Sequence, residues 1–410
     1  MERLSEMNFE SFNAILECEC GKTHDGRLNV VVDEELITVL KKIKDRGRVL
    51  IIASNDVQKT YLDSLHESLL NDYDVKRFCS LEDNNAEAIE GVDIVIAVGG
   101  ERIISRAKLL ALSYSTSLVI VPTGINYGEY STSFSVVEYG EVGVIRPSRA
   151  PDWILADTKL LTSLSKSVWA DCLGEVYSKT VSFFDYFYRA VVKGDGCKYL
   201  IDRALDVLEE GLISFEKNDE NVSRLVRLST ALASLYKMTG LTSGGEEQVT
   251  RTLIRFAKNR ERRGTGDGEV KFLSAVLVAR LYKKFLSKQS RWGAWDTFSD
   301  MDKTRRLLSL DELEVVRLAK NVNAEISDYR DYKVTANRGE LYSLAMRSDD
   351  ILTRAHYKLV KIYPDGGYHL RYYLTSEEIL GVVECAPFFW SGDTLLTFIK
   401  GSGLLTLTGA

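Results

Sequence analysis

Short apolar runs alternate with longer amphipathic stretches through the first part of the chain. The runs are rich in β-branched residues and end at glycine or proline, which is typical of strands buried on both faces of a sheet. The stretches between them repeat apolar residues at the spacing of an amphipathic helix. Strands that alternate with helices predict a parallel sheet with right-handed crossovers. We predict strands at residues 28–32, 48–53, 75–78, 94–98 and 118–121, with helices at 34–44, 57–70 and 103–111.

A change of pattern near residue 150 predicts a second domain. Residues 136–145 match the pattern of a hairpin, a linker with two prolines follows, and beyond residue 158 the periodicity is helical. The end of the chain is aromatic and β-branched with glycine-containing turns, which favours strands. The fold class is therefore α/β, with a parallel-sheet domain at 1–148, an all-helical domain at 149–350 and a β-rich appendage at 351–410. Helices of the second domain are predicted at 166–192, 199–216, 221–238, 246–260, 270–286 and 310–326.

Composition and charge exclude several classes of protein. A hydrophobic fraction of 45% and a charged fraction of 27% are those of a globular protein. No apolar run approaches the roughly 18 to 20 residues of a membrane span, and the opening MERLSEMNFE lacks the basic and apolar regions of a signal peptide. A net charge of -6 argues against non-specific binding to nucleic acid. We expect a cytoplasmic protein with no membrane span and no nucleic-acid partner.

The string CECGKTH near the start of the chain contains residues that bind metals. Cys18 and Cys20, with His24 close by, resemble half of a zinc site. No second cysteine pair follows at the spacing of a zinc ribbon, and six cysteines are too few for a disulfide scaffold. We expect a reduced, structural turn here.

A glycine pair separates the predicted strand at 94–98 from the following helix. Gly99 and Gly100 would let a phosphate approach the backbone and meet the N–H groups and positive dipole end of the helix. Many α/β units, however, turn on glycines only for tight packing. In a parallel sheet, ligands bind beyond the carboxyl ends of the strands. We therefore expect Asn55, Gly99 and Thr123 to line one crevice.

Three further strings carry a family resemblance. A glycine motif is matched in part by Gly99, Gly100 and Lys108, and a Pro-Thr loop with downstream serines by Pro122 and Thr123. The best match is PDWILADTKLLTSLSKSVWADCLGEVYSKTVSFFDY, at residues 151–186. Together these strings resemble the superfamily of iron-dependent alcohol dehydrogenases, glycerol dehydrogenases and dehydroquinate synthases, and within it the sn-glycerol-1-phosphate dehydrogenases. The resemblance covers about the first 290 residues.

The resemblance implies a Rossmann-like domain that binds NAD or NADP and a helical domain that holds a divalent metal, with catalysis in the cleft between them. In the family, the metal polarises the substrate oxygen while the nicotinamide exchanges hydride with the same carbon. The implied substrate is a small phosphorylated polyol or ketone, such as glycerol 1-phosphate or dihydroxyacetone phosphate, and a homo-oligomer is left open. The implied cofactor contacts are Gly99, Gly100, Glu101, Arg102, Thr123, Asn126 and Thr132, and the implied substrate contacts are Gly128 and Arg251.

The metal positions implied by the resemblance depart from the family pattern. They fall on Glu175, Glu247 and Asp267, where the family has one acid and two histidines. Three carboxylates favour magnesium or manganese over zinc or iron. They would also over-neutralise a divalent ion and weaken it as a Lewis acid. The alternative is that the three carboxylates face solvent in a site that no longer binds metal.

The cofactor and substrate loops depart as well. Glu101 replaces a family glycine and places a negative charge where a pyrophosphate would lie, although a glutamate also suits the helix dipole there. A substrate-contacting aspartate of the family falls on Gly128. Two functions stay open: an NAD(P)- and metal-dependent dehydrogenase of the glycerol-1-phosphate type, or a catalytically silent relative retained for binding or assembly. A sugar-phosphate cyclase is favoured less, because it too relies on two histidine ligands.

Overall fold

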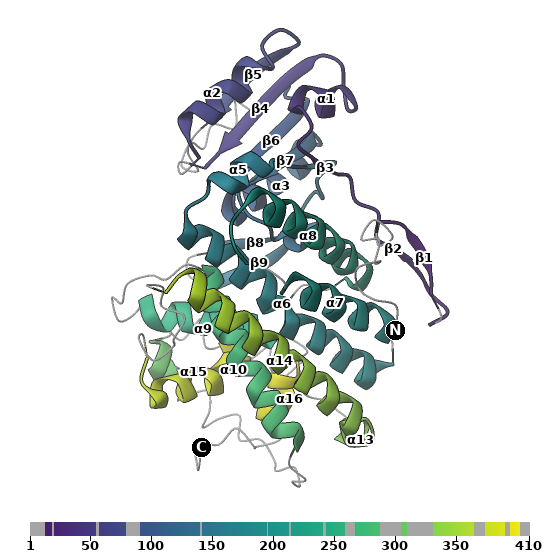
Figure 1. Cartoon of the computed structure of the whole chain (residues 1–410), viewed down its shortest axis with the longest axis vertical. Coiled ribbons are helices and arrows are strands. Elements are labelled where there is room, and N and C mark those ends of the chain that lie inside the picture. Colours follow the sequence, from purple (N-terminus) through teal and green to yellow (C-terminus); the bar gives the residue numbers. More distant parts are fainter. Residues whose placement is uncertain are drawn as a thin grey trace. The chain divides into compact units, whose positions relative to one another are not determined.

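The chain forms two compact units (Figure 1). The first comprises residues 1–17, 22–165 and 216–238, and the second comprises residues 18–21, 166–215 and 239–410. The computed structural model describes residues 13–18, 20–54, 57–78, 91–139, 142–194, 196–212, 215–240, 243–258, 267–287, 305–309, 331–364, 374–389 and 394–401.

A six-stranded parallel sheet forms the core of the first unit. Its middle strand β6 has no exposed residue, as its unbroken apolar run predicts. The order of the strands across the sheet is β3-β10-β7-β6-β4-β5. Their bounds are Val30–Val32 (β3), Trp153–Ala156 (β10), Ser117–Pro122 (β7), Ile94–Gly99 (β6), Gly47–Ala53 (β4) and Tyr73–Phe78 (β5).

The register of the sheet places the carboxyl ends of its central strands side by side. Ala53 pairs with Val98, and Gly99 pairs with Pro122. The strand ends that we expected to line one crevice are therefore neighbours in the sheet, although Asn55 itself lies outside the described residues.

Short helices and two hairpins complete the first unit. The hairpin of β8 and β9 matches the one predicted at residues 136–145, and a second hairpin, β1–β2, was not predicted. The bounds of these elements are Leu36–Lys41 (α1), Lys59–Glu67 (α2), Glu101–Ser113 (α3), Tyr127–Tyr130 (α4), Thr158–Ser163 (α5), Asp219–Thr239 (α8), Ile15–Glu17 (β1), Thr23–Asp25 (β2), Phe134–Tyr139 (β8) and Val142–Pro147 (β9).

The elements of secondary structure that are described in the second unit are all helices, as the periodicity predicts. Its central helix α6 packs closely against α10 at two glycines, because a Cβ atom on Gly174 would stand 2.6 Å from the carbonyl oxygen of Gly268. The helices of this unit are Lys166–Lys193 (α6), Lys198–Gly211 (α7), Gly245–Lys258 (α9), Asp267–Ser287 (α10), Asp331–Ala336 (α13), Arg338–Ile362 (α14), Ser376–Phe389 (α15) and Leu395–Gly401 (α16).

Three features differ from the expected domain plan. The first unit extends to residue 165 rather than 148, because β10 joins its sheet, and it also takes in residues 216–238 from the predicted helical domain. The appendage expected to be β-rich is helical where it is described, in α14, α15 and α16. Packing overrides the local preference of its β-branched and aromatic residues. The helix predicted at 310–326 lies outside the described residues.

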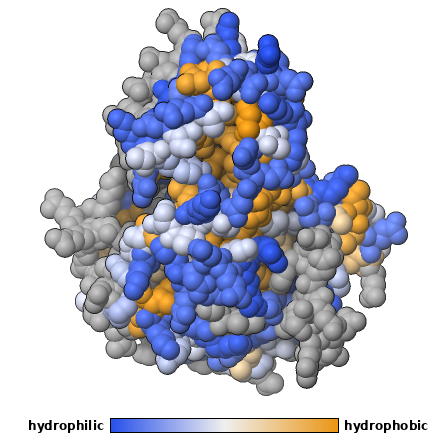
Figure 2. Space-filling model, turned by 45° about the horizontal axis from the view of Figure 1, so that its top comes forward, coloured by the Kyte–Doolittle hydropathy of each residue, from blue (hydrophilic) through white to orange (hydrophobic). Residues whose placement is uncertain are grey.

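The surface is mostly polar in the view of Figure 2, where hydrophobic residues occupy smaller areas between hydrophilic ones. Among the described residues, no helix is both long and apolar enough to cross a membrane.

Candidate functional site

The turn between β6 and α3 has the shape of a phosphate-binding turn. Gly99 has a positive φ of 156°, and a Cβ atom there would stand 3.0 Å from the Cβ of Ser54, so glycine fits this position best. Gly100 is the N-cap of α3 and makes no side-chain cap. A Cβ atom added to Gly100 would have Thr123 Oγ1, 4.0 Å away, as its nearest neighbour. The N-terminus of a 13-residue helix therefore begins beside open space at this turn.

The charged residues of this turn lie on α3. Glu101 is half-buried in the first turn of the helix, and Arg102 is exposed. Lys108, which matches a family lysine, is buried and donates hydrogen bonds to Phe134 O (2.5 Å) and Thr132 Oγ1 (3.2 Å). Lys108 and Thr132 therefore hold the start of the β8–β9 hairpin against α3.

The loop after β7 contains two of the predicted contacts. Asn126 is buried, and its Nδ2 group has no hydrogen-bond partner among the described residues. Because an unmade hydrogen bond on a buried amide is costly, this group is suited to a ligand oxygen. Gly128 lies in α4, and a Cβ atom there would stand 3.1 Å from Cγ of Tyr236. The tyrosine ring thus takes the space that the side chain of the family aspartate would need.

The first predicted metal position, Glu175 on α6, is held by a lysine. Lys271 on α10 donates from Nζ to Glu175 Oε1 over 2.8 Å. The Lys271 side chain is 4% exposed and that of Glu175 13%. Each charge of this pair compensates the other where water is largely excluded. The alternative in which Glu175 faces solvent is therefore wrong.

The second predicted position, Glu247 on α9, is held by an arginine one helical turn later. Arg251 Nε donates to Glu247 Oε1 over 2.7 Å, and the glutamate side chain is 8% exposed. Arg251 is the residue that we expected to contact substrate, and here it neutralises a carboxylate of its own helix. The third position, Asp267, begins α10, and its side chain lies outside what the structure describes.

These residues do not fit a catalytic divalent metal. Each described carboxylate has a cation at hydrogen-bond distance, and a metal bound there would have to displace Lys271 and Arg251 or share the site with them. A buried ammonium or guanidinium next to a divalent ion adds repulsion at short range. Lys271 and Arg251 neutralise the two carboxylates, so neither requires a bound metal ion for charge balance.

A buried acidic pair close to these positions was not predicted. Asp185 on α6 accepts from the backbone N–H groups of Gly245 (2.7 Å) and Leu395 (2.8 Å) and from the Tyr282 hydroxyl (3.0 Å). It thereby fixes the first residues of both α9 and α16. Burial raises the pKa of Asp185 to about 7, although these donors act in the opposite direction.

Glu246 is the second member of this pair, and it is fully buried. Its Oε1 accepts from the Ser182 hydroxyl and from the Gly244 backbone N–H, while Oε2 has no partner among the described residues. Burial raises the pKa of Glu246 to about 7 against the attraction of Lys179, and the nearby charge of Asp185 adds to the rise. Lys179 is thus buried beside an acid. The sequence signal missed here was Glu246 directly before Glu247.

The chain resembles one family in sequence and several of its members in structure. Residues 28–163 match the family model described as iron-containing alcohol dehydrogenase. The glycerol-1-phosphate dehydrogenase [NAD(P)+] of Methanoregula boonei is 24% identical over 262 residues, which is 62% of this chain and 72% of that protein. The enzyme of the same name from Pyrobaculum neutrophilum is 24% identical over 254 residues, covering 58% and 71%.

Solved structures show the same fold. An archaeal halo-thermophilic alcohol dehydrogenase from a Red Sea brine pool superposes with a TM-score of 0.58 at 13% identity, covering 92% of this chain and 93% of that one. An iron-containing alcohol dehydrogenase from Thermotoga maritima gives 0.54 at 16%, covering 88% and 90%. The α/β fold with a six-stranded parallel sheet and a helical second unit is therefore theirs, and the chain is a distant homologue of the iron-containing alcohol dehydrogenase family, with glycerol-1-phosphate dehydrogenases among its relatives.

Proposed function

We propose that this protein is a dinucleotide-binding member of the dehydrogenase fold in which internal cations have replaced the catalytic metal. The observation that carries the proposal is the buried ion pair between Glu175 and Lys271, supported by the pair between Glu247 and Arg251. Without a Lewis acid on the substrate oxygen, reduction of a ketone by NAD(P)H loses its main source of charge stabilisation. The protein then binds NAD or NADP and serves in binding or assembly, with slow or no turnover.

The nucleotide half of the proposal rests on the turn at β6 and α3. Gly100 leaves room for a phosphate at the helix N-terminus, and Thr123 and the buried amide of Asn126 offer further donors in the same unit. Arg102 supplies an exposed positive charge next to Glu101. We expect weak binding of the pyrophosphate, because Glu101 opposes it.

A second candidate, an active metal-dependent dehydrogenase of a small polyol phosphate, is supported by the similarity to glycerol-1-phosphate dehydrogenases over 262 residues. This function would need Glu175 and Glu247 to leave their ion pairs for an ion. Any ion bound by these oxygen ligands is expected to be magnesium or manganese rather than zinc or iron.

Two measurements on the full chain test the proposal. The first is NAD(P)H-dependent reduction of dihydroxyacetone phosphate with added magnesium, manganese or zinc, where we expect slow or no turnover. Brisk turnover with any of these ions would overturn the proposal in favour of the dehydrogenase.

The second measurement is calorimetric titration with NADH and NADPH. Gly100→Asp should weaken binding, because it places a second carboxylate at the helix N-terminus without a steric clash. Gly339→Asp is the matched control, since Gly339 on α14 also has open space around its Cβ position. No binding by the wild-type protein, or equal binding by the Gly100→Asp variant, would contradict the nucleotide half.

A further inference from the structure

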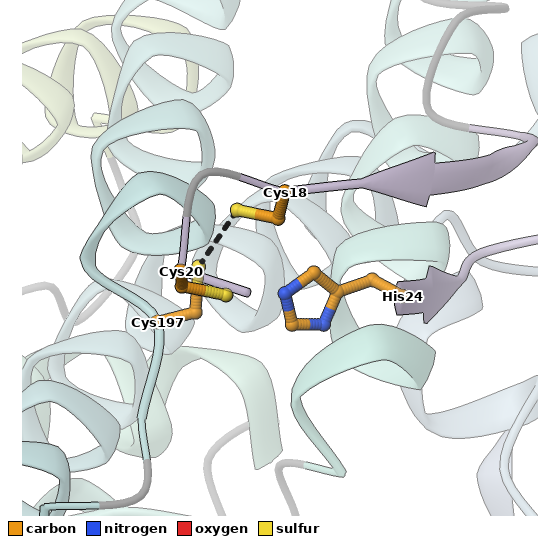
Figure 3. Close-up of side chains that lie close together, drawn as sticks. All are labelled: Cys18, Cys20, His24 and Cys197. Carbon is orange, nitrogen blue, oxygen red and sulfur yellow. Dashed lines mark hydrogen bonds between the residues drawn. The ribbon is translucent and has the colours of Figure 1, made fainter. Parts of the chain in front are cut away.

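Four metal-binding side chains come together from the turn after β1, from β2 and from the residue before α7. They are Cys18, Cys20, His24 and Cys197, and one ligand atom from each lies within 4.8 Å of all the others. Figure 3 shows the three thiols and the imidazole directed toward a common centre. The Sγ atoms of Cys18 and Cys197 are 3.4 Å apart.

The hairpin brings its three ligands together through a tight turn. Leu16 pairs with His24 across β1 and β2, so the turn between these strands carries both cysteines. Gly21 has a positive φ of 77°, and its N–H donates to Cys18 O over 2.9 Å. Such a left-handed glycine lets the chain fold back within a few residues. Cys18, Cys20 and His24 are therefore fixed on one side of a short loop.

The fourth ligand comes from a second glycine turn far along the chain. Gly194 ends α6 with a positive φ of 77°, and a Cβ atom on Gly196 would stand 1.9 Å from the Cβ of Ala190. Only glycine fits at Gly196, so the chain can turn back sharply against its own helix. Cys197 follows as the N-cap of α7, with 1% of its surface exposed.

We propose that Cys18, Cys20, His24 and Cys197 form a structural zinc site. Three thiolates and one imidazole are a ligand set of tetrahedral structural zinc, with Zn–S bonds of about 2.3 Å and ligand atoms therefore about 3.8 Å apart. The separations in the cluster suit that geometry, and 3.4 Å is far longer than the roughly 2.05 Å of a disulfide bond. All four ligands come from the protein, which leaves no open position for substrate.

The site's role follows from what it joins. Zinc would tie the turn that carries Cys18 and Cys20 to Cys197, the N-cap of α7, within the second unit, and α7 packs on α6. A bound zinc ion supplies the free energy that two short strands and a glycine turn lack. This inference does not depend on the proposed nucleotide function.

The test uses full-length protein prepared under reducing conditions without chelator. Elemental analysis should find one zinc per chain, and Cys18→Ser and Cys197→Ser should each lose it. Cys385→Ser is the matched control, because Cys385 is equally buried but lies outside the cluster, and it should keep its zinc. Zinc retained by the Cys197→Ser protein would overturn the site.

A spectroscopic measurement on the wild-type protein separates this site from the acidic positions on α6 and α9. Cobalt in place of zinc should show thiolate-to-cobalt charge-transfer absorption, and X-ray absorption of the zinc form should show three sulfur neighbours and one nitrogen. An oxygen-only shell, no zinc after reconstitution, or a Cys18–Cys197 disulfide in the reduced preparation would each refute the proposal. These readouts need no variant to fold.

Discussion

Two groups of potential metal ligands in this protein have opposite surroundings. At the positions that match the family's metal site, Glu175 and Glu247 are each bound by a basic side chain. At the hairpin, one ligand atom from each of Cys18, Cys20, His24 and Cys197 lies within 4.8 Å of the others. The contrast teaches that a position in the fold does not by itself make a metal site. A metal ion is needed where the ligands' negative charge has no other compensation, and at the first site Lys271 and Arg251 already provide the positive charge.

The largest effect should come from the hairpin. Stripping the protein with a strong chelator should lower the free energy of unfolding by about 4 kcal/mol or more, the stabilisation given by a ligand at about a thousand times its Kd. Thermal unfolding with and without chelator measures this. Cys385→Ser protein should respond like the wild type, and Cys197→Ser protein should be unresponsive. A wild-type melting curve that the chelator leaves unchanged would show that the hairpin cluster, like the acidic positions, holds no stabilising metal.

The second-largest effect on stability should come from breaking the ion pair between Glu175 and Lys271. Lys271→Met should cost about 3 to 5 kcal/mol of unfolding free energy, because it removes the cation that compensates the largely buried Glu175 carboxylate. Denaturant unfolding measures the loss. The control is Lys283→Met, which breaks the more exposed pair with Asp349 and should cost at most about 1 kcal/mol. Manganese should partly restore the Lys271→Met protein if an ion can take the place of the lysine. Equal, small losses in both variants would mean that Lys271 is no substitute for a metal.

The third prediction concerns protonation of Asp185 and Glu246, the buried acids close to Glu175 and Glu247. Because burial raises the pKa of Asp185 and of Glu246 to about 7, the folded protein holds more protons than the unfolded chain between about pH 4 and pH 7. The stability that these two groups contribute is therefore fully present below this window and is lost as the pH rises through it. Glu246→Gln keeps an oxygen for Ser182 and removes one titrating group, so it should flatten the fall by on the order of 2 kcal/mol.

Unfolding free energies at several pH values between 4 and 8 test this prediction. The control is Glu220→Gln, which changes an exposed glutamate of α8 and should leave the slope as it is. A Glu246→Gln protein with the wild-type slope would show that Glu246 ionises normally in the folded state.

The smallest effect concerns the nucleotide turn. Glu101→Gln removes a negative charge from the first turn of α3 and should tighten NADH binding by about 0.3 to 1 kcal/mol, the usual strength of a charge at a helix terminus. Calorimetric titration measures the change, with Glu67→Gln on α2 as a control in the same unit. Unchanged affinity would place the phosphates away from this helix end.

The strands of the parallel sheet were predictable because a strand that is buried on both faces needs apolar residues at every position, which gives an unbroken apolar run in the sequence. The run at residues 94–98 became β6, and the run at 118–121 became β7. The β1–β2 hairpin was missed because its strands have three residues each, too few for a periodic signal. The C-terminal segment was predicted to form strands, but its apolar residues pack in helices within the second unit, where Gln248 on α9 bonds to Thr394 and Thr397.

The candidate site was only half predictable. The resemblance located Glu175 and Glu247, and the absence of histidine there was plain from the sequence. Their partners were not equally visible: Arg251 lies one helical turn from Glu247, but Lys271 and Glu175 are 96 residues apart and meet only when α6 and α10 pack. For the same reason Cys197 could not be joined to CECGKTH, since nothing in the spacing of two distant glycine turns shows that they meet.

The distance along the chain between the hairpin and Cys197 also has a consequence for biosynthesis. A ribosome adds about 5 to 20 residues per second, so roughly 10 to 35 s pass between synthesis of Cys20 and of Cys197. During that interval the nascent chain carries two thiols and an imidazole with no fourth ligand, in a loop open to oxidants and to other metals. Correct maturation therefore depends on the reducing power and the zinc supply around the ribosome, before α7 exists to complete the set.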